Sequence, residues 1–211
     1  MINTLIIINS FFLSFNYMNS QWIYNNKQYY LNKKINNIIL PGTHDSGTYN
    51  VIFNLGLNGK YWSYLKKAKN LPLVYPIINS WTKCQDLTFY QQLELGIRSL
   101  DIRLVFRNID KKWYISHTLL TTLFSTMIND ANRFLKENEN EFIIIQIKLD
   151  YPYRKEVIKN DKIKNSFWKM LHENKEFYQK IYQGEGIPKY QDLLDMKKNI
   201  ILLIDKDLFS N

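Results

Sequence analysis

The run Glu141–Leu149 (E-F-I-I-I-Q-I-K-L) is the segment that most constrains how this chain can fold. Its β-branched residues favour a strand, and so continuous a run is typical of a strand buried on both faces. Such strands occur almost only in parallel sheets that helices cover. The sequence therefore predicts an α/β domain, and 211 residues suffice for one.

Shorter segments repeat this pattern along the chain. Four further strands are predicted, at Asn37–Leu40, Ile97–Val105, Trp113–Ser116 and Asn199–Ile204. Amphipathic stretches with helical spacing lie between them, at Asp86–Leu95, Leu123–Asn138 and Ile163–Tyr182. Strands that alternate with helices indicate a parallel sheet or a TIM-like (β/α) barrel.

Such a barrel has eight strands and about 250 residues. Five strands are predicted here in 211 residues. We assign residues 21–211 to this barrel and residues 1–20 to an N-terminal arm or signal peptide.

The stretch Leu5–Phe15 is mostly apolar, like the core of a secretory signal peptide. No Lys or Arg precedes it, however, and no clear cleavage site follows it, so a packed arm is an equal alternative. With a cleaved signal we expect a secreted or peripheral membrane protein, and otherwise a cytoplasmic one. No apolar run reaches the roughly 20 residues that span a bilayer.

A long excursion, Val51–Trp81, interrupts the alternation of strands and helices. It contains Pro72, Pro76, Gly56 and Gly59 among many aromatic residues. Connectors of this length are often functional, but an insertion that covers the side of the barrel is equally compatible with the sequence.

The net charge of +9 (28 Lys and Arg against 19 Asp and Glu) is compatible with nucleic acid, anionic lipid or phosphate partners. The basic residues are scattered and form no RNA-binding motif, so we expect no nucleic-acid partner.

The single cysteine, Cys84, excludes a disulfide framework and a zinc site built from cysteines. A zinc site built only from histidines would need all three in the chain.

Polar residues stand at or just past the ends of four consecutive predicted strands. They are His44 and Asp45, then Asp101 and Arg103, then His117, and finally Gln146 and Lys148. Residues two apart share one face of a strand, and charges there are costly unless they pair or line a site. Active sites of parallel barrels lie at the C-terminal ends of the strands. We therefore expect these side chains to converge at one rim.

This set of side chains suits phosphodiester cleavage by an internal hydroxyl. Two histidines can divide general base and general acid work near neutral pH. Arg103 and Lys148 can neutralise a phosphate and the charge that builds on it. Asp45 and Asp101 are too few carboxylates for a typical divalent metal site, so we expect no metal and no cofactor.

Three segments resemble one known family. Leu40–Thr48 (L-P-G-T-H-D-S-G-T) is similar to the opening motif of the phosphatidylinositol-specific phospholipase C X-domain family, in its bacterial-type branch. Gly96–Arg103 resembles the second-strand motif of that family, and Glu141–Lys148 resembles its fourth strand. The resemblance extends from about Trp22 to Asp205. It implies an eight-stranded barrel, so the five predicted strands imply an incomplete barrel over residues 21–211 that is truncated at its C-terminal side or completed by a partner.

The resemblance implies an enzyme that cleaves phosphatidylinositol-type lipids to diacylglycerol and an inositol cyclic phosphate. It implies that His44 is the general base and His117 the general acid. Arg103 would contact the phosphate, in the position where metal-dependent relatives have a calcium-binding carboxylate, which implies independence of calcium. Asp45 and Asp101 would orient Arg103, His117 and the attacking hydroxyl, and Lys148 would contact an inositol hydroxyl or the phosphate.

The implied partner is phosphatidylinositol or a related phospholipid at a peripheral membrane surface, and we expect a monomer.

Two features depart from the family. Thr118 replaces the glycine that usually follows the second histidine, and the late carboxylate that steers the base is assigned to no residue here. A non-catalytic phosphoinositide- or membrane-binding relative is the main alternative. Glycerophosphodiester phosphodiesterases fit less well, because they are metal-dependent and carry His-Arg-Gly after the first strand.

Overall fold

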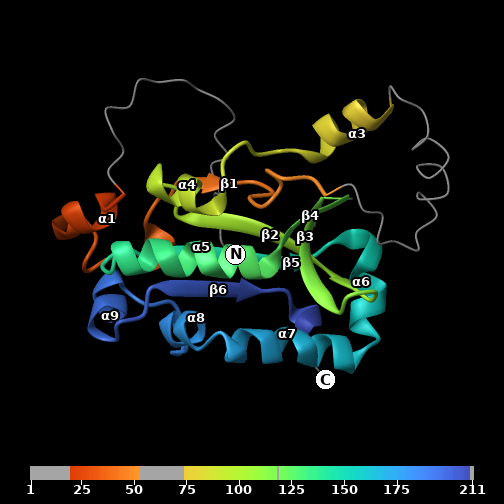
Figure 1. Cartoon of the computed structure of the whole chain (residues 1–211). Coiled ribbons are helices and arrows are strands. Elements are labelled where there is room, and N and C mark those ends of the chain that lie inside the picture. The colour runs from red at the N-terminus through yellow and green to blue at the C-terminus, as the bar shows by residue number, and fades with distance from the viewer. Residues whose placement is uncertain (1–19, 53–73, 118, 210–211) are drawn as a thin grey trace.

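The computed structural model describes residues 20–52, 74–117 and 119–209. Its centre is a six-stranded sheet with the order β4-β3-β2-β5-β6, and β1 lies beside the start of β2 (Figure 1). The strands are β1 (Gly42–Thr43), β2 (Ser99–Arg107), β3 (Lys112–His117), β4 (Leu119–Leu123), β5 (Ile143–Leu149) and β6 (Ile200–Ile204). The sheet stays open within the described residues.

Strands β1, β2, β5 and β6 run parallel, whereas β2, β3 and β4 form an antiparallel meander. The helices are α1 (Trp22–Asn25), α3 (Val74–Thr82), α4 (Phe89–Glu94), α5 (Phe124–Glu137), α6 (Tyr151–Ile158), α7 (Asp161–Glu173), α8 (Lys175–Lys180) and α9 (Tyr190–Asp195). Short 3-10 turns lie at Lys27–Tyr29, Ile35–Asn37 and Lys206–Leu208.

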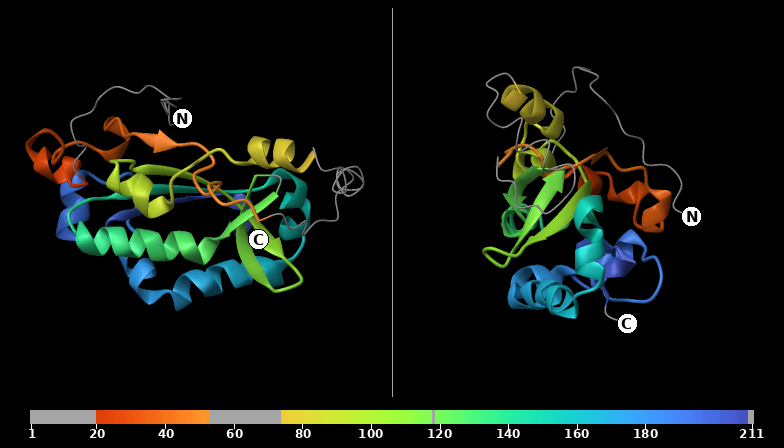
Figure 2. Two further views of the ribbon diagram at one scale, coloured as in Figure 1. Left: turned by 45° about the horizontal axis from the view of Figure 1, so that its top comes forward. Right: turned by 90° about the vertical axis from the view of Figure 1, so that its right-hand side faces the viewer.

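The main core lies between one face of the sheet and a layer formed by α4, α5, α7 and α8 (Figure 2). Alternate residues of β2, namely Leu100, Ile102 and Leu104, are buried on this face. Helix α5 meets them with an apolar stripe at helical spacing that includes Phe124, Met127, Ala131 and Phe134. This packing fixes β2 and β5 against the helices and leaves the opposite face of both strands for polar residues.

Strand β5 is buried on one face only, which corrects the expectation of a strand buried on both. Ile143, Ile145 and Ile147 are buried, whereas Gln146 is half-buried and Lys148 is exposed. The helices cover one face, and the other face lines an open hollow near the C-terminal end of the strand. The continuous β-branched run therefore reflects strand propensity as well as burial.

A second, smaller core closes the other end of that open face. Ile23, Ile35 and Ile38 of the N-terminal segment pack there with Phe142, Tyr190 and Leu193. The N-terminal segment and α9 thus cover the ends of the strands where β5 and β6 begin.

A fully buried ion pair joins this N-terminal segment to the sheet. Arg98 Nε lies 2.8 Å from Glu141 Oε2, and both side chains are inaccessible to solvent. Arg98 also donates to the carbonyls of Leu93 and Ile97 at 2.8 Å, and to that of Ser20. Glu141 Oε1 accepts the backbone N–H of Tyr24 at 2.8 Å. The pair therefore anchors α1, the end of α4 and the starts of β2 and β5 at one point.

Most predicted elements are present, with boundary shifts of a few residues. The predicted strand Asn37–Leu40 is wrong. A 3-10 turn occupies Ile35–Asn37, and pairing with β2 begins at Pro41, whose carbonyl accepts the N–H of Arg98 at 2.9 Å. The predicted helix Ile163–Tyr182 is two helices, because Asn174 leaves the helical conformation and caps α7 by donating to the Met170 carbonyl at 2.7 Å.

Two other predictions concern segments that the structure does not describe or describes only in part. Leu5–Phe15, and Val51–Trp81 apart from its two ends, lie outside the described residues. Among the residues that are described, no helix combines the length and apolar character needed to cross a bilayer.

Candidate active site

The turn that follows β1 is fixed to β2 by reciprocal hydrogen bonds. The N–H of Ser46 donates to the Asp101 carbonyl at 2.9 Å, and the N–H of Asp101 donates to Ser46 Oγ at 2.9 Å. Gln92 of α4 donates to the Ser46 carbonyl at 2.8 Å. Gly47 packs so closely that a Cβ there would lie 2.7 Å from Ile115. The motif sequence therefore holds its two central residues, His44 and Asp45, against the sheet.

Asp45 lies at the centre of the cluster. Its φ of 47° is in the left-handed region, which Asp tolerates better than most residues, and its side chain is only 1% exposed. Oδ1 lies 2.9 Å from Arg103 Nε. Oδ2 lies 3.1 Å from His44 Nε2 and 3.7 Å from His117 Nε2. One carboxylate therefore has the guanidinium and both imidazoles as neighbours.

Asp101 makes a second, parallel set of contacts. Its Oδ2 lies 2.8 Å from His44 Nδ1, and its Oδ1 lies 3.2 Å from Lys148 Nζ. The register explains this contact, because Asp101 and Arg103 of β2 pair with Gln146 and Lys148 of β5 in parallel. Residues two apart on each strand then project from the same face.

His117 reaches the cluster because β3 runs antiparallel to β2. The pairing of Leu104 with Ile115 brings the end of β3 back toward the middle of β2, where Asp101 and Arg103 stand. His117 Nδ1 lies 3.3 Å from the Thr82 carbonyl and 3.5 Å from Cys84 Sγ. The expectation that four strand ends form one parallel rim is thus wrong for β3, although the predicted residues do converge.

Burial decides the electrostatics of the central carboxylate. Loss of hydration raises the pKa of Asp45 above its ordinary value, and the Arg103 guanidinium opposes that rise only in part. Neither oxygen of Asp45 makes a well-directed hydrogen bond with the described residues, so charge contacts alone hold it. Asp45 is therefore sensitive to any change in the positive charges around it.

The structure brings together all six predicted residues: His44, Asp45, Asp101, Arg103, His117 and Lys148. The arrangement can move protons through two imidazoles and can hold an anion between Arg103 and Lys148. His172 is elsewhere, on α7, where its ring contacts the Trp168 carbonyl at 2.8 Å.

Residues 64–206, more than half of the chain, match the family described as "Phosphatidylinositol-specific phospholipase C, X domain". The chain belongs to this family. The Leu40–Thr48 motif precedes the matched stretch. We assign it to the X domain because its turn is hydrogen-bonded to Asp101 of β2.

Several relatives of this X domain are similar in sequence. A PI-PLC X-box domain-containing protein of Dictyostelium discoideum is 31% identical over 59% of this chain and 16% of its own length. The human PI-PLC X domain-containing protein 2 is 27% identical over 63% of this chain and 44% of its own. The 1-phosphatidylinositol phosphodiesterase of Listeria monocytogenes is 27% identical over 78% and 43%. The X-domain chain thus spans less than half the length of each.

Solved structures agree on the fold. The phosphatidylinositol-specific phospholipase C of Listeria monocytogenes aligns with a TM-score of 0.51 at 25% identity, over 82% of this chain and 54% of that one. A Staphylococcus aureus phosphatidylinositol-specific phospholipase C aligns with a TM-score of 0.60 at 22% identity, over 82% and 49%. The fold class is therefore the TIM-barrel type expected, represented here by an open six-stranded sheet.

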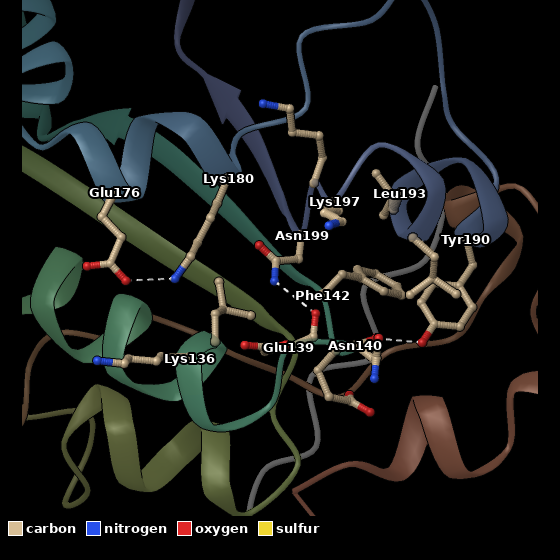
Figure 3. A pocket seen from close by; sticks show the side chains of 14 residues that line it. Lys136, Glu139, Asn140, Phe142, Glu176, Lys180, Tyr190, Leu193, Lys197 and Asn199 are labelled. Atoms are coloured by element: carbon tan, nitrogen blue, oxygen red, sulfur yellow. Dashed lines mark hydrogen bonds and ion pairs between the residues drawn. The ribbon is translucent and has the colours of Figure 1, made fainter.

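Two of the hollows formed by the described residues lie at opposite ends of the parallel strands. One, of about 450 Å³, adjoins the cluster, and Arg103 and Lys148 form part of its wall. The other, of about 490 Å³, lies at the starts of β5 and β6 (Figure 3). Some of its polar groups satisfy one another, since Lys180 pairs with Glu176 at 3.1 Å and the Tyr190 hydroxyl donates to the Asn140 carbonyl at 2.6 Å. The hollow of about 450 Å³ is the better candidate for a ligand site, because Arg103 and Lys148 of the cluster line it.

Sequence reasoning missed two residues of the X domain that touch the cluster. Cys84 contacts His117, and Gln85 Nε2 donates to the His44 carbonyl at 2.7 Å. Both follow α3, outside the strands that carried the prediction, and no spacing signal pointed to them. Thr118, the departure from the family pattern, lies outside the described residues.

Proposed function

We propose that this X domain is a phosphodiesterase that cleaves phosphatidylinositol-type lipids by two-histidine acid–base catalysis. The observation that carries the proposal is the position of both imidazoles around the buried Asp45 carboxylate, with Arg103 beside them. Family membership and the bacterial phosphodiesterase relative support it.

His44 is the general base in this proposal. His44 has a carboxylate at each ring nitrogen. Asp101 Oδ2 makes a hydrogen bond at Nδ1 at 2.8 Å, whereas Asp45 Oδ2 lies 3.1 Å from Nε2 without hydrogen-bond geometry. Because a carboxylate can only accept, the proton of a neutral His44 is placed on Nδ1. The lone pair is then on Nε2, 3.3 Å from Arg103 Nη2. Asp101 thereby takes the steering role that the family gives to a late carboxylate.

The reaction proceeds through an internal attack. The inositol 2-hydroxyl oxygen forms a bond to phosphorus as His44 Nε2 takes its proton. The bond from phosphorus to the diacylglycerol oxygen breaks, and His117 donates a proton to that oxygen. The products are diacylglycerol and an inositol cyclic phosphate, and Arg103 and Lys148 stabilise the charge on the phosphoryl oxygens.

The donor set argues for calcium-independent turnover. Arg103 lies against Asp45 and Lys148 lies against Asp101, so a protein cation already neutralises each carboxylate. Calcium takes six to eight oxygen ligands, which two neutralised carboxylates do not supply. The fixed guanidinium performs the charge neutralisation instead.

The test uses the full chain and phosphatidylinositol vesicles in EDTA. We expect release of water-soluble inositol phosphate, and a loss of about 10²–10⁴-fold in turnover for His44→Ala and for His117→Ala. His172→Ala is the matched control and should leave turnover unchanged, because that histidine lies on α7.

Three results would contradict the proposal. Turnover that strictly requires calcium would exclude the role of Arg103, and equal turnover in His44→Ala would exclude the base. Vesicle binding by the full chain without turnover would instead favour a non-catalytic lipid-binding X domain.

A further inference from the structure

The single cysteine of the chain lies beside one of the two clustered histidines. Cys84 Sγ is 3.5 Å from His117 Nδ1, and the N–H of Cys84 donates to Thr48 Oγ1 at 3.1 Å. That backbone bond ties the cysteine to the turn that carries His44 and Asp45. The thiol is therefore held at the site, and the residue is exposed to solvent.

A buried carboxylate completes the group. Asp45 Oδ2 lies 3.7 Å from His117 Nε2, whereas Cys84 lies beside Nδ1 of the same ring, and the carboxylate makes no well-directed hydrogen bond with the described residues. One ligand atom each from Asp45, Cys84 and His117 can be chosen so that all three lie within 4.8 Å of one another. Arg103 contacts Oδ1, and Oδ2 lies between the two imidazoles, 3.1 Å from His44 Nε2 and 3.7 Å from His117 Nε2, so Oδ2 is the oxygen nearer to a cation bound at His117.

The donor types select the kind of metal. Thiolate, imidazole and carboxylate are zinc ligands, with bond lengths of about 2.0–2.3 Å. At a tetrahedral angle those lengths put sulfur and nitrogen about 3.5 Å apart, and Cys84 Sγ and His117 Nδ1 are 3.5 Å apart. Calcium and magnesium prefer oxygen ligands and have little use for a thiolate.

We propose that Cys84, His117 and Asp45 form a binding site for a soft divalent cation of the Zn²⁺ class, and that the bound cation inhibits turnover by occupying His117. Binding displaces the thiol proton of Cys84 to solvent and uses a neutral imidazole nitrogen of His117. The fourth position is open to water. Metal binding does not depend on the proposed function, whereas the inhibition does.

Two alternatives fit less well. His44, Asp45 and Asp101 also lie close together, but this group has no thiol, and both of its carboxylates already contact a cation, Arg103 or Lys148. In the proposed site only one of the three ligands, Asp45, has such a neighbour. An oxidation switch at Cys84 would need an accessible thiolate, and burial raises the pKa of this thiol, which disfavours the thiolate. A metal overcomes that cost by bonding directly to sulfur.

The test is a titration of the full chain with Co²⁺, which substitutes for Zn²⁺ and absorbs light. We expect the intense visible bands of tetrahedral Co²⁺ together with a near-ultraviolet thiolate-to-cobalt band, both bleached by Zn²⁺ and unchanged by excess Ca²⁺. Cys84→Ser should remove the thiolate band and weaken Co²⁺ binding by about 100-fold or more, since even outer-shell losses cost 10–100-fold. His172→Ala is the matched control and should bind Co²⁺ like the parent chain.

The outcomes separate this proposal from the proposed function. Bound Co²⁺ without a thiolate band in the parent chain would overturn the site, whatever the fold of the variants. Equal Co²⁺ affinity in Cys84→Ser would overturn it as well. Zn²⁺ should inhibit phosphatidylinositol turnover reversibly, with recovery in EDTA. If the chain binds Co²⁺ through the thiolate but does not turn over lipid, the metal site is supported and the proposed phosphodiesterase activity is refuted.

Discussion

Replacement of Glu141 by alanine tests whether the buried Arg98–Glu141 pair anchors the base of the sheet. The substitution leaves the Arg98 guanidinium in the interior with carbonyl acceptors only, from Leu93, Ile97 and Ser20. It also removes the acceptor of the Tyr24 N–H. Burial already lowers the pKa of Arg98, and the neighbouring Glu141 carboxylate opposes that effect.

Removal of one partner of a buried ion pair costs about 3–5 kcal/mol of unfolding free energy. Both side chains here are inaccessible to solvent, so the full penalty applies. For a chain of this size each kcal/mol shifts the Tm by about 2–4 °C, so Glu141→Ala should lower it by roughly 6–20 °C.

Urea denaturation followed by circular dichroism measures the change. Glu173→Ala is the matched control, because that residue ends α7 and both it and its partner Lys169 are exposed, and it should leave the midpoint nearly unchanged. The double variant Arg98→Met/Glu141→Leu should recover part of the loss, because it leaves no unpaired charge, whereas the Tyr24 N–H stays without its acceptor. A midpoint for Glu141→Ala equal to that of the control would refute the reasoning.

Two further predictions concern Asp45 and the start of α7. Because burial raises the pKa of Asp45, its ionised form is less favourable in the folded chain than in the unfolded one, so Asp45→Asn should stabilise the chain at pH 7 while it lowers turnover. The gain in stability should be absent below about pH 3.8, where the carboxyl is neutral in both the folded and the unfolded chain. It should grow as the pH rises to the raised folded pKa and stay constant at higher pH. Urea midpoints measured across this pH range test the prediction, and an Asp45→Asn variant less stable than the parent at pH 7 would contradict it. Asn160 caps α7 by accepting the N–H groups of Lys162 and Ile163 at 3.1 and 3.3 Å, so Asn160→Ala should cost about 1 kcal/mol and Asn160→Gly only a few tenths, and equal losses would argue against the cap.

The sequence could predict the parts of the fold that depend on local periodicity. The apolar stripe of Leu123–Asn138 became α5, because its spacing describes one buried face. The β-branched run became β5 because of its strand propensity, although the burial on both faces predicted from it was wrong. The candidate site was also predictable, since a charged pair such as Asp101 and Arg103 is rarely tolerated on a sheet without partners. The shared face of the pair required only the two-residue repeat of a strand.

What the sequence could not predict depends on contacts between distant segments. The direction of β3 is set by its hairpin with β2, and β4 (L-L-T-T-L) is buried despite two threonines, one of which donates to the Ile115 carbonyl. Cys84 gave no periodic signal, and its position follows from the bond of its N–H to Thr48.

The charge balance of the cluster explains why the proposed chemistry needs both cations. Asp45 and Asp101 carry two negative charges, and Arg103 and Lys148 carry two positive ones, so the empty site is neutral when both imidazoles are. A phosphodiester brings one negative charge. Protonation of His117 supplies the compensating positive charge and is also what the general acid requires. If either Arg103 or Lys148 were removed, the bound substrate would leave a net negative site, and charge that builds on the phosphoryl oxygens would be opposed rather than stabilised.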